Sequence, residues 1–127
     1  KINNKNQVIA WGTGVVLREF LHVDDMAKAS IYVMELDTQL YRHNTSASLS
    51  HINVGSGIEV SIKELTEKIA KVVGFSGHIV WDSSKPDGAP RKLMNSQKLE
   101  SLGWTASREL TDGLKDTYQA FLGSGLE

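Results

Sequence analysis

The sequence contains no cysteine and only two prolines among its 127 residues. Without cysteine the chain can form no disulfide, no thiolate metal site and no cysteine nucleophile. Because disulfides are typical of secreted proteins, we expect a cytoplasmic location. Long apolar runs are lacking too, so no part of the sequence is expected to cross a membrane.

An excess of charge of one sign is also absent. The 14 basic and 15 acidic residues give a net charge of −1 and are mixed along the chain. Binding of a polyanion requires a basic field, so nucleic acid is not an expected partner. A hydrophobic fraction of 40% is typical of a globular protein, and this length suits one modest core. We therefore expect residues 1–127 to form a single domain.

The common catalytic and cofactor motifs are missing. After Gly12 and Gly14, Leu17 stands where a dinucleotide-binding turn has its third glycine. No tyrosine is followed four positions later by lysine, and no nucleophile elbow, P-loop or HExxH motif occurs. The four histidines lack the spacing of a metal set. We expect no catalytic, cofactor-binding or metal-binding residue in this chain.

The most informative stretch is 11–29. Its two glycines allow a tight turn, and residues 17–23 then alternate apolar and polar side chains with the period of a strand. This pattern places Arg18 on the polar face of that strand, before a helix capped by Asp24 or Asp25. A guanidinium fixed beside a glycine turn suits a phosphate or carboxylate. A surface ion pair is the alternative, and periodicity alone does not decide between the two.

A second candidate site lies in the loop 83–91, which holds both prolines. Asp87 offers an acceptor for a ribose hydroxyl or a base edge, and Arg91 and Lys92 add two adjacent positive charges. Trp11, at the glycine turn, has a flat ring that suits a sugar or base. The alternatives are an ordinary loop with solvated charges and a tryptophan of the core or of a lid.

The remaining pattern predicts alternating strands and helices, and therefore an α/β fold. Ser61 and Glu64 have the spacing of a capping box, and Gly74 supplies a left-handed end to the helix that follows them. We also expect a surface loop over 37–50. The other expected strands are 8–11, 51–54 and 77–82, and the other expected helices are 24 to about 36 or 40, 96–102 and 111–122.

Motifs along nearly the whole chain resemble one known family. They are W-G-T-G (11–14), R-E-F-L-H-V-D-D-M-A (18–27), S-H-I-N-V-G-S-G (50–57), I-K-E-L (62–65), K-P-D-G-A-P-R-K (85–92), L-G-W (102–104) and T-Y-Q-A-F-L (117–122). Together they resemble the extended short-chain dehydrogenases that act on nucleotide sugars, and specifically the subfamily whose members make GDP-L-fucose.

The resemblance implies a role for the chain. Members of this subfamily bind NADP(H); they epimerise GDP-4-keto-6-deoxy-D-mannose at C3 and C5 and then use NADPH to reduce it at C4. Their Rossmann half holds the cofactor and the catalytic residues and would lie upstream, so this chain would be the small C-terminal substrate-binding domain, inactive alone. Trp11, Arg18 and Asp87 would contact the GDP-sugar, with Lys92 near the diphosphate or base. The full-length enzyme would be a homodimer, formed chiefly through the missing half.

Other functions fit the same residues. The chain could come from a related GDP-mannose dehydratase or an epimerase. It could instead be a non-catalytic nucleotide-sugar binding module, or a structural dimerisation domain. A glycine fingerprint and a Tyr-x-x-x-Lys motif within the preceding roughly 200 residues, the length of a typical nucleotide-binding domain, would decide for the enzyme.

Overall fold

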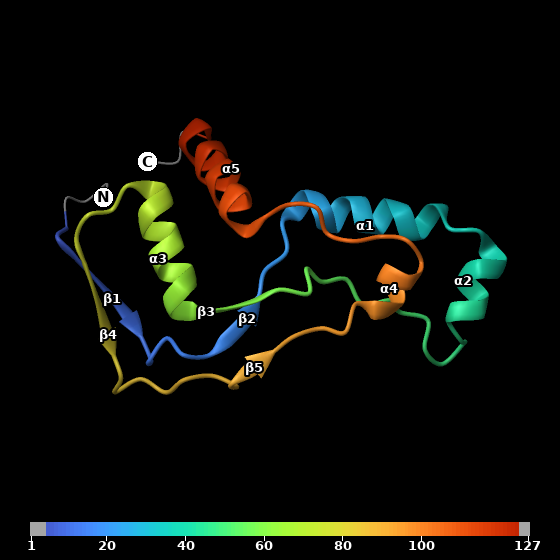
Figure 1. The fold of residues 1–127 in the computed structure, drawn as a ribbon, viewed down its shortest axis with the longest axis horizontal. Coiled ribbons are helices and arrows are strands. Elements are labelled where there is room, and N and C mark those ends of the chain that lie inside the picture. Colours follow the sequence, from blue (N-terminus) through green and yellow to red (C-terminus); the bar gives the residue numbers. More distant parts are fainter. Residues whose placement is uncertain (1–4, 125–127) are drawn as a thin grey trace. The chain divides into compact units, whose positions relative to one another are not determined.

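The computed structural model describes residues 5–124 (Figure 1). The chain divides into two compact units, each built from separated segments. Unit 1 comprises the described residues of 1–18, 59–92 and 109–127, and unit 2 comprises 19–58 and 93–108. Strands and helices alternate along much of the chain, which confirms the α/β class.

The strands form two small sheets. In the first, β1 (Gln7–Trp11) pairs in parallel with β4 (His78–Asp82), from Gln7 opposite His78 to Trp11 opposite Asp82. The second sheet has the order β3-β2-β5, and β2 runs parallel to β5. Its strands are β3 (Glu59–Ser61), β2 (Leu17–Glu19) and β5 (Arg91–Lys92). The strand expected over 17–23 is thus shorter, because helix α1 begins at Val23.

Two helices of unit 1 confirm their predicted signals. Helix α3 (Ile62–Val73) begins with the expected capping box, in which the Ser61 hydroxyl accepts the Glu64 N–H and the Glu64 side chain accepts the Ser61 N–H. It ends at Gly74, whose φ of +66° is left-handed. Helix α5 (Leu110–Gly123) contacts α3.

Unit 2 contains three helices, α1 (Val23–Glu35), α2 (Thr38–Asn44) and α4 (Gln97–Ser101). The residue that caps α1 is His22, whose Nδ1 accepts the Asp24 N–H at 3.2 Å, so the expected aspartate cap is wrong. The loop expected from residue 37 contains α2. Leu36 is extended, with ψ of 142°, and Asp37 then caps a new helix.

The strand expected over 51–54 is not formed. Residues 51–54 have no ladder partner among the described residues and belong to no strand. A strand needs a neighbouring strand as well as the right pattern, and residues 5–124 supply none there.

Asp25 lies buried in unit 2 with only 1% of its surface exposed. Its carboxylate accepts the Ser107 N–H at 3.0 Å, the Ser107 hydroxyl at 2.9 Å and the Arg108 N–H at 2.8 Å. Burial alone would raise the pKa of Asp25, but these hydrogen bonds outweigh it and lower the pKa below its ordinary value. The ionised side chain therefore joins α1 to the segment that precedes α5.

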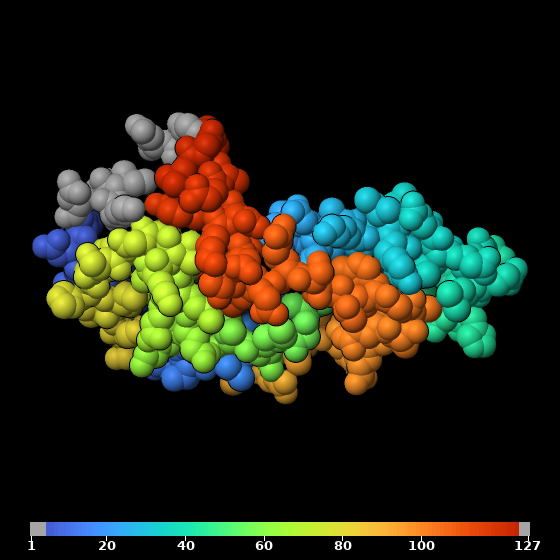
Figure 2. Space-filling model, turned by 45° about the horizontal axis from the view of Figure 1, so that its top comes forward, coloured from blue at the N-terminus to red at the C-terminus, as the bar shows by residue number. Residues whose placement is uncertain are grey.

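Apolar burial is sparse for a chain of this length. Among the described residues, the buried apolar side chains are Ala29 and Leu99, both in unit 2. Helix α1 instead exposes an apolar face, and its atoms form part of the surface in Figure 2. Four large residues of this face, at helical spacing, are Val23 (72% exposed), Met26 (42%), Ile31 (55%) and Met34 (84%). A helix long and apolar enough to span a membrane does not occur between residues 5 and 124.

Candidate functional site

The glycine turn follows β1 directly and exposes Trp11. Gly12 donates its N–H to the Asp82 carbonyl at 3.0 Å, which extends the pairing of β1 with β4. Gly12 and Gly14 have φ of +83° and +77°, and a Cβ on Gly14 would lie 2.6 Å from the Trp81 ring. Only glycine fits these positions. Trp11, the last residue of β1, is 74% exposed at this turn.

Lys85 lies over the Trp11 ring. Its Nζ is 5.6 Å from the ring centroid, within the range of a cation–π contact. The Lys85 N–H is donated to the Asp82 carbonyl at 3.2 Å, so the start of the loop is fixed to the end of β4. The Trp11 ring can stack on a flat or ring-shaped ligand, and the Lys85 ammonium can attract a negative charge.

Asp87 lies against the same turn. Its Oδ1 accepts the Thr13 N–H at 2.9 Å, and its Oδ2 accepts the Thr13 hydroxyl at 2.6 Å. These two bonds, the hydroxyl first, lower the pKa of Asp87 below its ordinary value, so the carboxylate is ionised near neutral pH. Trp11 and Asp87, both candidates from the sequence, are thus brought to one turn.

Arg18 and Lys92 are neighbours in the second sheet. They lie directly opposite each other in the parallel pairing of β2 with β5, so both side chains stand on the same face. Arg18 is half-buried, and its Nη1 donates to the Leu17 carbonyl at 2.5 Å. No carboxylate of residues 5–124 forms an ion pair with Arg18, whereas the surface-pair alternative requires one. Arg18 and Lys92 thus place two positive charges on one face of this sheet.

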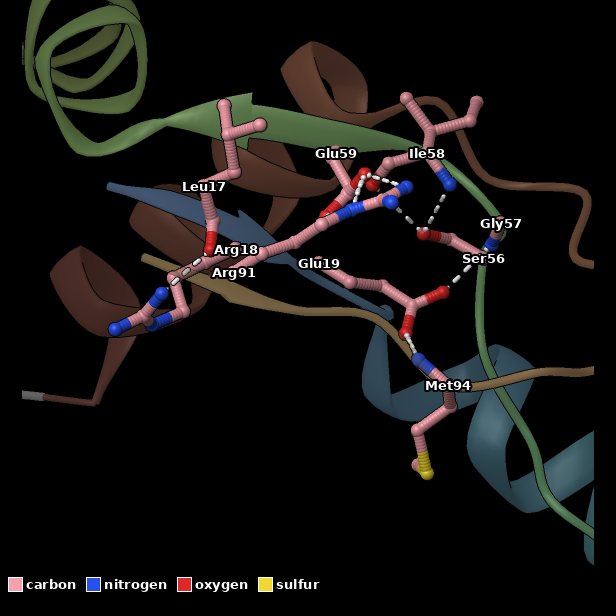
Figure 3. A network of polar contacts seen from close by, with 9 residues as sticks. All are labelled: Leu17, Arg18, Glu19, Ser56, Gly57, Ile58, Glu59, Arg91 and Met94. Carbon is pink, nitrogen blue, oxygen red and sulfur yellow. Dashed lines mark hydrogen bonds and ion pairs between the residues drawn. The ribbon is translucent and has the colours of Figure 1, made fainter. Parts of the chain in front are cut away.

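Arg91, by contrast, is neutralised. Its guanidinium forms two hydrogen bonds of 2.8 Å and a 2.6 Å ion pair with the carboxylate of Glu59 (Figure 3). The hydrogen bonds from Arg91, and then its charge, lower the pKa of Glu59, and the same pairing raises the pKa of Arg91. Of the two adjacent charges at the end of the loop, only that of Lys92 is left without this compensation.

Glu59 and Thr13 were not predicted from the sequence as part of this site. Glu59 meets Arg91 only because β3 and β5 lie on either side of β2, an order that no local pattern specifies. Thr13 was noted only as a member of the glycine turn. A hydroxyl between two glycines of a turn indicates a polar contact, but no local pattern identifies its partner, Asp87, which lies 74 positions away.

A third acidic residue, Glu19, has a structural role within unit 2. Its carboxylate accepts the N–H of Gly57 at 2.7 Å and that of Met94 at 3.2 Å (Figure 3). A Cβ on Gly55 would lie 2.5 Å from one of its oxygens, so the S-H-I-N-V-G-S-G segment needs its glycine here. Within the described part of the chain, no group of three or more acidic or histidine side chains is placed to hold a metal ion.

Comparison with known proteins gives the same relatives as the motifs. The sequence model of the NAD dependent epimerase/dehydratase family matches residues 1–55. The chain is 55% identical over 94% of its length to a GDP-L-fucose synthase of Escherichia coli, and 52% identical over 96% to a putative GDP-L-fucose synthase of Arabidopsis thaliana. The resemblance expected from the motifs is confirmed.

A solved structure of a related GDP-sugar enzyme is also similar to this chain. A GDP-D-glycero-L-gluco-heptose synthase from Campylobacter jejuni, crystallised in the presence of NADPH, is 40% identical with a TM-score of 0.81 over 92% of this chain. The chain covers 33% of that structure, and 37% and 34% of the two curated relatives. It therefore spans about a third of the length of the proteins it resembles.

Proposed function

The chain is a homologue of the GDP-L-fucose synthases, and from this premise we propose that it is the C-terminal substrate-binding domain of such an enzyme. The full-length protein would convert GDP-4-keto-6-deoxy-D-mannose to GDP-L-fucose by 3,5-epimerisation and NADPH-dependent 4-reduction. The identity of 50–55% to several GDP-L-fucose synthases supports this substrate over that of a more distant epimerase or dehydratase.

The observation that carries the proposal is that Arg18 and Lys92 lie opposite each other on neighbouring strands. Two cations on one face of a sheet suit the two phosphates of a nucleoside diphosphate, because the planar guanidinium gives bidentate bonds and the ammonium adds a second charge. The third cation, Arg91, forms an ion pair with Glu59, so its charge is compensated. Within residues 5–124, the uncompensated positive charges of these three cations are those of Arg18 and Lys92. The diphosphate would bind across Arg18 and Lys92.

The glycine turn would contact the rest of the ligand. Trp11 is exposed, so it can stack on a ring, and the ionised Asp87 can accept hydrogen bonds from hydroxyl or N–H donors. A carboxylate repels phosphate, so Asp87 suits the ribose, base or sugar instead. The phosphates of one nucleotide sugar would thus contact the two cations, and its hydroxyl or N–H donors would contact Asp87.

The chemistry would lie in the missing part of the protein. An upstream Rossmann half would bind NADP(H) and supply the catalytic groups, and no cofactor would be held by residues 1–127 alone. The exposed apolar face of α1 supports a covering partner, since contiguous apolar surface marks an interface. A cytoplasmic homodimer, formed chiefly through that half, completes the proposal.

Steady-state kinetics of the Arg18→Lys enzyme test this function. Lysine keeps the charge but loses the planar fork, and a hydrogen bond to a charged group is worth about 1.5–3 kcal/mol, so KM should rise roughly tenfold to a hundredfold. The turnover number should change far less, because contacts remote from C3, C4 and C5 are alike in ground and transition states.

Arg42→Lys is the matched control, since Arg42 is exposed on α2 in unit 2 and should leave KM unchanged. An unchanged KM for Arg18→Lys with a lowered melting temperature would assign Arg18 to structure and reject its proposed contact with substrate.

A further inference from the structure

We infer that Thr13 is a positioning residue for the substrate: its N–H and hydroxyl fix the Asp87 carboxylate at the glycine turn that follows Trp11. This inference rests on the proposed function, in which Asp87 contacts the GDP-sugar. Thr13 itself need not touch the ligand.

The geometry of the contact supports this role. Thr13 donates through two separate groups, and each reaches a different oxygen of the same carboxylate, at 2.9 Å and 2.6 Å. Two bonds to two oxygens fix the plane of the carboxylate as well as its position, which a single bond would leave free to rotate. One lone-pair direction on each oxygen remains for a ligand donor.

The support for Thr13 is rigid. Its neighbour Gly12 is bonded to the end of β4, and a Cβ on Gly12 would lie 2.4 Å from the nearer Asp87 oxygen. The carboxylate therefore lies against bare backbone, in a space that only glycine leaves open. Thr13 is held between two left-handed glycines, so its N–H direction is set by the fold rather than by a flexible side chain.

The loop that carries Asp87 is anchored at both ends. Lys85 is bonded to the Asp82 carbonyl at the start of the loop, and the Pro90 carbonyl accepts the Leu17 N–H at its end. Between these points the two hydrogen bonds with Thr13 join the loop to the turn. Loss of the Thr13 hydroxyl would leave the Asp87 carboxylate held by the Thr13 N–H alone, while both ends of the loop stay attached.

The test is steady-state kinetics of the full-length enzyme with Thr13→Val. Valine keeps the branched shape and the N–H but lacks the hydroxyl. We expect KM for the GDP-sugar to rise roughly fivefold, as for loss of one ordinary hydrogen bond, with kcat changed less than about twofold. Thr13→Ser, which restores the hydroxyl, should return KM to near the wild-type value.

A double-mutant cycle separates positioning from general stability. In an Asp87→Ala background, Thr13→Val should raise KM no further, because the group it positions is gone. Thr117→Val is the matched control: the Thr117 hydroxyl donates only to the Gly113 carbonyl of its own helix, at 2.8 Å, so KM should not change. Should Thr13→Val fail to fold, Thr13→Ala removes the same hydroxyl and enters the same cycle.

The outcomes distinguish the two proposals. A raised KM for Asp87→Ala together with an unchanged KM for Thr13→Val would overturn the positioning role and leave the proposed function intact. Unchanged KM values for Asp87→Ala and Arg18→Lys together would reject the binding surface itself. Additive effects of Thr13→Val and Asp87→Ala would show that Thr13 acts independently of Asp87, and would overturn the inference.

Discussion

At the scale of single residues, carboxylates organise both units by accepting main-chain N–H groups. Asp25 binds two and Glu19 binds two in unit 2, and Asp87 binds one in unit 1. The sequence predicted Trp11, Arg18 and Asp87 as candidates because turns, alternation and loop chemistry are local. It could not predict Glu59 opposite Arg91, which depends on sheet order.

Asp25→Asn should destabilise the chain in a pH-dependent manner. The pKa of Asp25 in the folded protein lies below its ordinary value of 3.8, so its contribution is present above about pH 3.8 and is lost as pH falls through the folded-state pKa. Near pH 7 the variant should lose on the order of 3 kcal/mol, and the difference from wild type should shrink below about pH 4. Urea unfolding at several pH values measures this.

Asp24→Asn is the control for that experiment. The neighbouring Asp24 side chain is 57% exposed, and its ion pair with Arg108 is 3.7 Å long, so its loss should cost less than about 1 kcal/mol. Equal effects of the two variants at every pH would contradict the buried role of Asp25.

At the scale of elements, the bounds of α3 were predicted from the capping residues at its two ends. The Ser61–Glu64 box and Gly74 bound α3 correctly because both act within one turn of the chain. Helix α2, within the loop expected over 37–50, was missed. The polar composition of this segment favours a loop, whereas the backbone is extended at Leu36 and Asp37 then caps a new helix. The strand over 51–54 failed because pairing is not local.

Gly74→Ala should destabilise the chain by roughly 1–2 kcal/mol, the cost of placing a side chain in the left-handed region. Gly123→Ala is the matched control at the end of α5. It has no neighbour within 4 Å of an added Cβ and no positive φ, so it should be neutral or slightly stabilising. Thermal unfolding compares them, and similar losses for both would contradict the assigned end of α3.

At the scale of the whole molecule, the sparse apolar burial agrees with a chain that spans about a third of its relatives. Composition predicts a globular protein, but it gives no information on which apolar faces remain uncovered. The apolar face of α1 is the example described above. If a Rossmann half covers this face, a substitution on it should affect the full-length enzyme.

Met34→Lys should affect the full-length enzyme and the isolated chain differently. Met34 is 84% exposed here, so the substitution should leave the melting temperature of the isolated chain nearly unchanged. If the missing half covers it, a buried charge should destabilise the full-length enzyme by several kcal/mol. Glu35→Lys, a polar neighbour on α1, is the control. Equal shifts of melting temperature for Met34→Lys in both proteins would argue against the covered face.

The central claim, that the turn and strand of unit 1 bind GDP, is tested most directly by the indole N–H signals of full-length enzyme labelled with ¹⁵N-tryptophan. Signals of Trp11, Trp81 and Trp104 can be assigned by single Trp→Phe variants. Addition of GDP should shift the Trp11 signal in a saturable manner, more weakly at high salt, and leave the Trp104 signal of unit 2 in place. A GDP titration that saturates while the Trp11 signal does not move would contradict the account.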